Sequence, residues 1–377
     1  MNRKVRMGMI GGGKDAFIGA VHRMAAALDG QIELVCGAFS SNPVKSIEVG
    51  KELHCAENRL YVSFKEMIMA ESRMPESMRM DFVSIVTPNH LHYEPAAFAL
   101  QNGFHVFCEK PLSFSIKEAL ELERLVKENK KIFGLAHNYT GYPLIKEARH
   151  LVRAGTLGKV RKILVEYPQG WLSERIEKEG QKQAAWRTAP DKAGISCCVG
   201  DIGTHAANLA EYISGLKITE IAADISTFVQ GRKLDDDAAI LLRLDGGAKG
   251  TLVASQIAAG EENELKIKVY GEKGGIEWLQ SDPNKLFLKL SGEPVQILKA
   301  GVNNLYLSDE ARKNCRLPGG HPEGYIESLA NLYRNFSAAI AGSAEKDFPG
   351  IEEGVRGMRF IEAAIESGKN NAEWIKL

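Results

Sequence analysis

The sequence predicts two domains of different class: an α/β domain with a doubly wound parallel sheet, followed by an α+β domain built on a largely antiparallel sheet. Up to about residue 137, short apolar runs alternate with amphipathic stretches, as expected for parallel strands whose two faces are covered by helices. After that point, apolar runs follow one another with only turn residues between them, which is typical of antiparallel strands. At roughly 100–200 residues per domain, the 377-residue chain has room for two domains.

The first domain is predicted to span residues 1–137. Its strands are expected at 5–10, 32–39, 81–86, 105–108 and 132–136. Its helices are expected where apolar residues recur at helical spacing, at 18–28, 46–53, 64–70, 93–101 and 116–127. Because the strands are apolar along their whole length, both faces of the sheet are expected to be buried.

The second domain is predicted to span residues 138–377, with the C-terminal helix free to pack back on the first domain. Helices are expected at 145–152, 323–341 and 352–366. Strands are expected at 160–167, 218–228, 238–244, 249–254, 266–270, 275–279 and 285–290. The acidic triplet at 235–237 is expected to begin a strand from a solvated loop rather than to bind a metal.

The composition argues against several classes of protein. Basic and acidic residues each number 48, so we expect neither a nucleic-acid binder nor an electrostatically held membrane protein. The six cysteines include no Cys-x-x-Cys pair, so we expect no metal site and no disulfide framework. No run approaches the ~20 apolar residues of a membrane span, and the apolar stretch after the basic N-terminus is too short for a signal peptide. These observations predict a cytoplasmic protein.

Three consecutive glycines follow the first predicted strand and lead into the first predicted helix. Glycine at a strand-to-helix turn lets the backbone approach a pyrophosphate, which the helix N-terminus then binds. Gly11, Gly13 and Ala16 fit the dinucleotide-binding pattern, and Gly19 is an alternative third small position. A plain tight turn is the other interpretation, but the alternating strands and helices favour dinucleotide binding.

The end of the second predicted strand bears on the choice between NAD and NADP. A carboxylate there would hydrogen-bond the ribose 2′-hydroxyl and repel a 2′-phosphate. The sequence has Ser40, Ser41 and Asn42 at this place, with no acidic residue. These side chains can hydrogen-bond either group, which favours tolerance of NADP. An ordinary Ser/Asn/Pro turn explains the same residues nearly as well.

Three further segments stand out together: Thr-Pro-Asn-His-Leu-His at 87–92, Glu-Lys-Pro at 109–111 and Gly-Asp-Ile-Gly-Thr-His at 200–205. With the glycine turn and in this order, they resemble the Gfo/Idh/MocA family of NAD(P)-dependent oxidoreductases, which includes inositol and glucose–fructose-type sugar dehydrogenases. The resemblance covers essentially the whole chain. It implies an NAD(P)-binding Rossmann domain followed by an antiparallel-sheet domain.

The first two segments follow predicted strands at their carboxyl ends, where cofactors dock on parallel sheets. The resemblance implies that cofactor contacts come from Thr87, Asn89, His92, Glu109 and Lys110. A lysine at this edge can hydrogen-bond the reacting oxygen and stabilise negative charge on it. In the family, the matching lysine is a catalytic or substrate-orienting residue, and its bond to the following proline is often cis.

The third segment places Asp201 and His205 four residues apart, on one face of a predicted helix. A carboxylate beside an imidazole can orient the ring and favour its role as a general base. The resemblance assigns this role to His205 with Asp201 nearby, whereas an ordinary ion pair is the alternative. The family commonly has a glycine-rich stretch before this aspartate, but here residues 194–199 are Gly-Ile-Ser-Cys-Cys-Val.

Weaker candidates for substrate contact come from three other places. They are Asn138 and Tyr139 after the last parallel strand, Trp186 and Arg187 before the third segment, and His321 in a glycine-rich turn. An aromatic ring beside a guanidinium suits a sugar ring. Packing or helix capping is about as good an explanation for each.

These residues lead to one main hypothesis and two alternatives. The main one is a dehydrogenase that transfers a hydride between a ring C–OH of a sugar, cyclitol or related polyol and NAD(P). The first alternative is a glycoside-cleaving or eliminating enzyme that uses transient oxidation on the same fold. The second is a non-catalytic dinucleotide-binding sensor. As in relatives, the C-terminal sheet is expected to form a homodimer or homotetramer.

Overall fold

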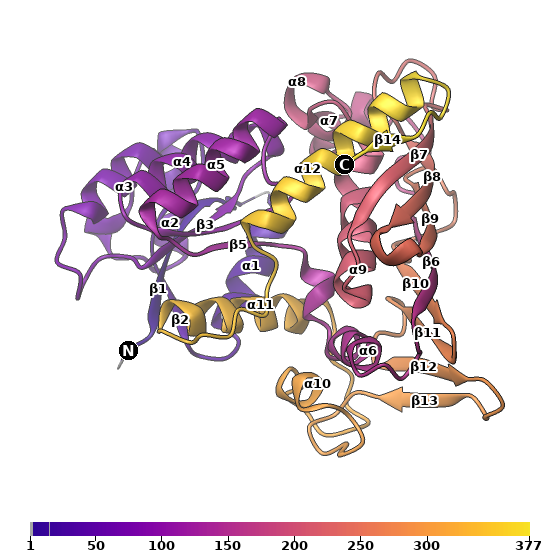
Figure 1. The fold of residues 1–377 in the computed structure, drawn as a ribbon. Helices are drawn as coiled ribbons and strands as arrows, with labels where there is room; N and C mark the ends of the chain where they lie inside the picture. The colour runs from indigo at the N-terminus through magenta and orange to yellow at the C-terminus, as the bar shows by residue number, and fades with distance from the viewer. Residues whose placement is uncertain (1–2, 15) are drawn as a thin grey trace. The chain divides into compact units, whose positions relative to one another are not determined.

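The computed structural model describes residues 3–14 and 16–377. Its internal contacts divide the chain into two units (Figure 1). The first consists of Met1–Asn138 and Tyr325–Val355, and the second of Tyr139–Gly324 and Arg356–Leu377. A linear division at residue 137 places 325–355 in the second domain, whereas the contacts group this segment with the first unit. The reason is the apolar face of the helix in this segment, which packs on the first helix of the chain.

The first unit contains five strands and the helices that cover them. The strands are β1 (Val5–Gly11), β2 (Ile32–Ala38), β3 (Phe82–Val86), β4 (His105–Cys108) and β5 (Phe133–Leu135). The helices are α1 (Phe17–Ala27), α2 (Pro43–Glu52), α3 (Phe64–Ser72), α4 (Tyr93–Gln101), α5 (Ile116–Asn129) and α11 (Tyr325–Ile340), and the first turn of α12 (Ile351–Lys369) belongs here too.

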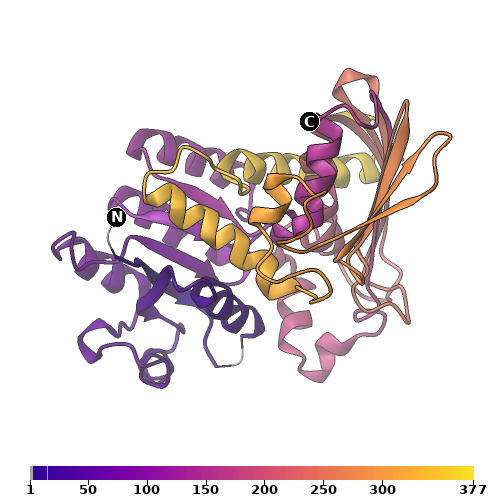
Figure 2. The same cartoon turned by 90° about the horizontal axis from the view of Figure 1, so that it is seen from below.

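The five strands form one parallel sheet in the order β2-β1-β3-β4-β5. Helices α1 and α11 lie side by side on one face, and α3, α4 and α5 cover the other (Figures 1 and 2). This confirms the predicted doubly wound sheet. The carboxyl ends of the strands therefore meet at one edge, where Gly11, Thr87 and Glu109 emerge.

An aromatic cluster fixes α11 against the sheet. The ring of Tyr333 stacks on that of Phe107 in β4, with 4.3 Å between ring centres. Phe336 contacts the edges of Phe107 and Phe82 at 5.3 and 5.2 Å. All four side chains are buried. Burial of each such ring stabilises a fold by roughly 1.5–3 kcal/mol. This packing therefore holds α11, near the C-terminal end of the sequence, against the N-terminal parallel sheet.

The second unit is built on nine strands. They are β6 (Val160–Pro168), β7 (Ile218–Ser226), β8 (Asp237–Leu244), β9 (Lys249–Ser255), β10 (Lys266–Gly271), β11 (Gly274–Leu279), β12 (Lys285–Leu290), β13 (Gln296–Lys299) and β14 (Ile375–Lys376). Its helices are α6 (Pro143–Arg153), α7 (Lys182–Arg187), α8 (Pro190–Ala193), α9 (Thr204–Ser214), α10 (Asp309–Lys313) and the rest of α12.

The nine strands form one sheet in the order β13-β12-β11-β10-β6-β9-β8-β7-β14. Every neighbouring pair is antiparallel except β6 and β9, which are parallel. This confirms the predicted α+β domain with a largely antiparallel sheet. Helices α6 and α9 pack on one face of the sheet. On the other face Leu241 and Val253 are 51% and 41% exposed.

Two local predictions for the second unit differ from the structure. Asp235 and Asp236 are buried rather than solvated, because backbone N–H groups of two neighbouring loops surround their carboxylates. The predicted continuous helix around Asp201 begins instead with a π-helical turn, Val199–Gly203, which leads directly into α9. Such turns have one more residue per hydrogen-bonded loop than an α-helix and often occur at functional sites.

Three further observations concern the described chain. All six cysteines are buried, and none of them forms a disulfide bond in the described chain. Within residues 3–14 and 16–377, no helix is both long enough and apolar enough to cross a membrane. In the same ranges, no cluster of three or more His, Cys, Asp or Glu side chains is placed to hold a metal ion.

Candidate active site

The glycine turn after β1 has the backbone that a pyrophosphate site requires. Gly11 and Gly12 have φ values of +82° and +73°, which side chains with a Cβ disfavour. A Cβ on Gly13 would lie 2.9 Å from the carbonyl oxygen of Phe39. The N-cap of α1 is Ala16, whose side chain makes no capping hydrogen bond. The first N–H groups of α1 thus have no side-chain cap, and the site fits a dinucleotide.

Gly19, rather than Ala16, lets α1 lie close to this turn. A Cβ on Gly19 would be 2.2 Å from the Cα of Gly12 and 2.9 Å from its carbonyl oxygen. No rotamer relieves a contact between a Cβ and backbone atoms. The third small residue of the pattern is therefore Gly19, which packs helix against turn.

Gly19→Ala is expected to lower the free energy of unfolding by about 1–3 kcal/mol, since overpacking must move α1 away from the turn. The affinity for NADH should fall as well, because the same backbone forms the phosphate site. Gly357→Ala, in α12, is the control: a Cβ there meets nothing within 4 Å, and alanine favours a helix. Urea unfolding and NADH fluorescence titration measure the two effects. Equal stability of the two variants would contradict this packing argument.

The tip of β2 carries hydroxyl and amide groups. The Ser40 hydroxyl accepts a hydrogen bond from the Asn42 N–H at 3.1 Å. The side-chain oxygen Oδ1 of Asn42 accepts one from the Lys45 N–H at 3.1 Å, which caps α2. Ser40 is half-buried and Ser41 is exposed. Asn42 therefore caps the turn and helix α2, as the turn interpretation expects. Ser41 is exposed, which leaves its hydroxyl accessible to a ribose or a phosphate.

The loops after β3 and β4 are joined by His92. Its ring is fully buried, and its two nitrogens lie 2.8 Å from the carbonyl oxygens of Thr87 and Pro111. Burial lowers the pKa of His92, although both carbonyl contacts act in the opposite direction. The Lys110–Pro111 peptide is cis, as the resemblance implied. The structure thus gives His92 a role in holding together the two loops that carry Thr87, Asn89 and Lys110.

Glu109 is tied to its own loop and to α1. Its carboxylate accepts a hydrogen bond from the Lys110 N–H at 3.1 Å and lies 2.8 Å from His22 Nε2. Burial raises the pKa of Glu109, but the His22 hydrogen bond and the nearby charges of His22 and Lys110 outweigh burial and lower it. Sequence reasoning missed His22. The available signal was a lone histidine among the apolar positions of α1.

His137 and Asn138 follow β5, and His137 is near enough to the Glu109–Lys110 loop to be affected by its charges. His137 is buried, and burial together with the charge of Lys110 lowers its pKa to about 3. Its imidazole is therefore neutral and adds no second positive charge beside Lys110. Asn138 is also buried, and its Nδ2 has no hydrogen-bond partner in the described chain. An unsatisfied buried donor costs about 1–3 kcal/mol, so a ligand oxygen here would be stabilised.

In the second unit, Asp201 is held by two side chains. Its Oδ2 accepts hydrogen bonds from Arg187 Nε at 3.1 Å and from Gln256 Nε2 at 2.9 Å. Arg187 in turn lies over the rings of Trp186 and Trp171, with its guanidinium carbon 4.2 and 5.8 Å from the ring centres. Arg187, which we expected to bind substrate, is therefore engaged with the carboxylate of Asp201. Gln256 had no recognisable sequence signal.

His205, on the first turn of α9, is buried against two tyrosines. The edge of its ring faces Tyr139 at 5.0 Å between ring centres, and Tyr167 lies at 6.4 Å. The two tyrosine hydroxyls are hydrogen-bonded to one another. Asn263 closes a ring with them: its carbonyl accepts from Tyr167 at 2.8 Å, and its amide donates to Tyr139 at 3.2 Å.

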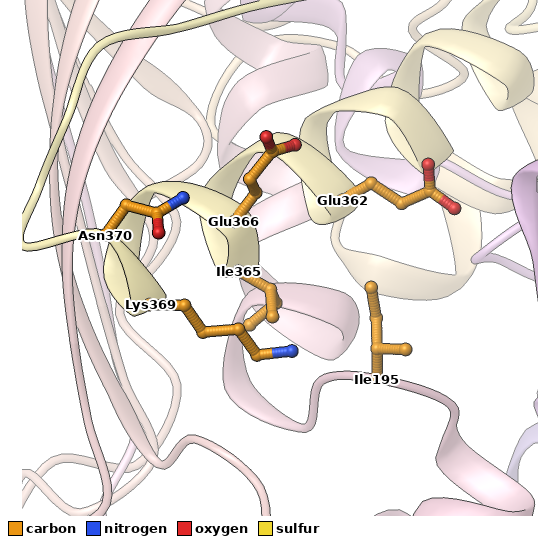
Figure 3. Close-up of a pocket in the computed structure, with 6 residues that line it drawn as sticks. All are labelled: Ile195, Glu362, Ile365, Glu366, Lys369 and Asn370. Carbon is orange, nitrogen blue, oxygen red and sulfur yellow. The ribbon is translucent and has the colours of Figure 1, made fainter.

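The remaining features of the second unit do not join this cluster. His321 is exposed, and its Nδ1 lies 3.2 Å from the carbonyl oxygen of Pro318 in the same turn. A shallow pocket runs along α12, with Ile195 opposite the helix (Figure 3). Figure 3 also shows Glu362, Glu366 and Lys369 there. None of the predicted site residues lines this pocket, and we assign it no role.

Comparisons with known proteins identify the family of both parts of the chain. Residues 5–137 match the model of an oxidoreductase family with an NAD-binding Rossmann fold, and residues 145–277 match the Gfo/Idh/MocA C-terminal domain. An uncharacterised oxidoreductase of Bacillus subtilis, YfiI, is 33% identical over 100% of this chain and 98% of its own length. A levoglucosan dehydrogenase of Pseudarthrobacter phenanthrenivorans is 27% identical over 73% of each chain.

A solved structure supports the same assignment for the whole chain. An inositol dehydrogenase homologue from Azotobacter vinelandii, in complex with NAD⁺, superposes with a TM-score of 0.94 at 34% identity, over 100% of this chain and 98% of the other. An inositol dehydrogenase homologue from the same organism, solved with NADH and myo-inositol, is 33% identical with a TM-score of 0.91, over 100% of this chain and 98% of the other. Because family models match both parts of the chain and a relative matches its full length, the chain belongs to the Gfo/Idh/MocA family of NAD-binding oxidoreductases.

Proposed function

We propose that this enzyme transfers a hydride between a ring C–OH of a sugar, cyclitol or related polyol and NAD(P). One observation carries the choice of substrate: the tyrosine–asparagine ring packed against His205. Neutral hydroxyl and amide groups beside aromatic rings can bind the many hydroxyls of a polyol without a charged counterpart. The names of relatives that act on levoglucosan or were solved with myo-inositol support the same class.

Each candidate catalytic residue has a separate task in this proposal. Oxidation of an alcohol requires removal of the hydroxyl proton as the hydride leaves carbon. His205 takes this proton, and Asp201, held by Arg187 and Gln256, supports it. Lys110 orients the substrate oxygen and stabilises its negative charge. The unpaired amide donor of Asn138 binds a ligand oxygen at the end of β5.

The cofactor contacts follow from the edge of the parallel sheet. Gly11, Gly13 and the uncapped N-terminus of α1 bind the pyrophosphate, and the loop of Thr87 and Asn89 lies at the carboxyl end of β3. When bound, the nicotinamide supplies the site that accepts or returns the hydride. With Ser40 and Ser41 at the tip of β2 and no carboxylate there, we propose that NADP is tolerated beside NAD.

A spectrophotometric screen of sugars and cyclitols with NAD and with NADP tests this function. We expect at least one ring polyol to reduce NAD at the nicotinamide absorbance band, with measurable reduction of NADP. Turnover of a glycoside without net NADH formation would instead support transient oxidation and elimination. If neither change occurs although NADH binds, the protein acts as a dinucleotide sensor and the dehydrogenase proposal is wrong.

We also propose that two or four copies assemble through the face of the nine-stranded sheet opposite α6 and α9. Leu241 and Val253 are large exposed apolar side chains on neighbouring strands of that face, as is common at subunit interfaces. Sedimentation velocity should show a dimer or tetramer, and Leu241→Lys should shift it toward the monomer. A monomeric wild-type protein at micromolar concentration would contradict this proposal.

A further inference from the structure

We propose that His22 is a positioning residue for Lys110, which it holds in place through the carboxylate of Glu109. The inference rests on the proposed function only in taking Lys110 as the catalytic lysine. His22 lies on α1, and the proposed function gives it no contact with substrate or cofactor. Its role follows from a buried chain of hydrogen bonds within the first unit.

The chain runs through four elements of that unit. Ser84 in β3 lies 2.8 Å from the hydroxyl of Tyr333 in α11. The Tyr333 hydroxyl lies 2.6 Å from His22 Nδ1, and His22 Nε2 lies 2.8 Å from Glu109 Oε1. The other oxygen of Glu109 accepts the N–H of Lys110. Ser84, Tyr333 and His22 are fully buried, and the Glu109 side chain is 13% exposed.

The positions of the protons follow from which groups can donate. The ionised carboxylate of Glu109 accepts only, so the hydrogen between it and His22 belongs to Nε2. If His22 is neutral, Nδ1 accepts from the Tyr333 hydroxyl, whose oxygen accepts from Ser84. If His22 is charged, Nδ1 donates to Tyr333, whose hydroxyl donates to Ser84. In both arrangements Ser84, Tyr333 and His22 each have a hydrogen-bond partner, and Nε2–H points at Glu109.

This chain restrains the loop that carries Lys110. His22 is fully buried, and a residue without a donor at this position leaves Glu109 Oε1 without the Nε2–H bond. Without that bond, the carboxylate can rotate and release the Lys110 N–H. A displacement of about 1 Å at a catalytic group can lower the rate ~10²-fold, so loss of the His22 contact should affect kcat more than KM.

The same contact affects the charge of Glu109. Other ionisable or polar groups near this carboxylate are Lys110, His92, His137, Cys108 and Tyr333. The pKa of Glu109 is lowered because its interactions with His22 and Lys110 outweigh burial. If His22 is replaced, burial dominates and the pKa of Glu109 rises. Glu109 then takes up a proton at higher pH, and activity should be lost earlier as the pH falls.

The test compares His22→Phe with His22→Gln. Phenylalanine keeps the ring volume without a donor, and we expect kcat to fall ~10-fold or more, with the acid limb of the pH–kcat profile shifted to higher pH. Glutamine keeps an N–H near the place of Nε2 and should restore most of kcat and of the profile. His105→Phe, at the opposite end of β4, is the control for general loss of stability and should keep the wild-type kcat.

A spectroscopic measurement is independent of activity and does not need the His22→Phe variant. In the wild-type protein labelled with ¹⁵N-histidine, one of the nine histidines should have a slowly exchanging Nε2–H whose signal disappears in His22→Gln. Tyr333→Phe should shift the Nδ1 resonance of the same ring and leave Nε2–H in place.

The outcomes separate this inference from the proposed function. If His22→Phe keeps the wild-type kcat and pH profile while Lys110→Met is inactive, the positioning role is wrong and the function stands. If Lys110→Met is active, the role of the lysine itself fails. If His22→Phe does not fold, a proton found on Nδ1 and not on Nε2 of His22 in the wild type overturns the inference.

Discussion

His205→Asn is expected to lower kcat for a polyol substrate by ~10²–10⁴-fold, the usual cost of losing a general base. The side chain lies at the start of α9, buried against Tyr139 and Tyr167. The amide of asparagine can occupy roughly the position of the histidine Nδ1, but it does not take up a proton near neutral pH. Steady-state kinetics with the best substrate of the screen measures the effect.

The control for this variant is His150→Asn on α6, a half-buried histidine of the same unit, which should retain wild-type kcat. NADH binding by fluorescence should be unchanged in both variants, since the glycine turn belongs to the other unit. Asp201→Asn should cause a smaller loss than His205→Asn, because the aspartate acts through the imidazole. A His205→Asn enzyme that retains more than a tenth of kcat would rule out the general-base assignment.

The strand ends of the first unit were predictable because the signals are local. The strands β1, β3 and β4 are followed within two residues by glycine, proline or a charged residue, and each ends within one residue of its predicted position. The residues that follow them, Gly12, Thr87 and Glu109, therefore lie at one edge of the parallel sheet as expected. Any chain with this alternation must place them there.

Contacts between distant parts of the chain could not be predicted in the same way. Tyr333 lies 311 positions after His22, on a helix whose amphipathic pattern shows that it packs but not on which domain. The sequence boundary assigned α11 to the second domain for this reason. The packing of α11 on α1 and the aromatic cluster around Phe107 show that the helix belongs to the first unit.

The polar contacts of the second unit could not be predicted from the sequence for a related reason. Arg187 and Asp201 are joined across a stretch that contains α8 and an irregular turn, so spacing gives no clue to their contact. Asp235 looked like part of a solvated acidic run, yet its carboxylate accepts the N–H groups of Cys197 and Val199. Charge in a sequence indicates exposure on average, but a carboxylate surrounded by donors is stable in the interior.

Lys110→Met is expected to lower kcat by ~10²–10³-fold, the usual cost of removing one group that stabilises charge on a reacting oxygen. The expectation follows from the charges around the site. Glu109 is held ionised next to the lysine, and the imidazole of His137 is neutral, with a pKa of about 3. Lys110 is thus the positive group on this loop, and methionine keeps its length without its charge.

Kinetics of three variants distinguish the charge of Lys110 from its geometry. Lys110→Arg keeps the charge but spreads it over a planar group with different donors, and it should recover less than a tenth of the wild-type kcat. Lys131→Met, a half-buried lysine before β5 whose pKa burial lowers, should leave kcat unchanged. If Lys110→Arg were fully active, a positive charge alone would suffice, and the argument that the Glu109–Lys110 loop must hold one donor in one place would be wrong.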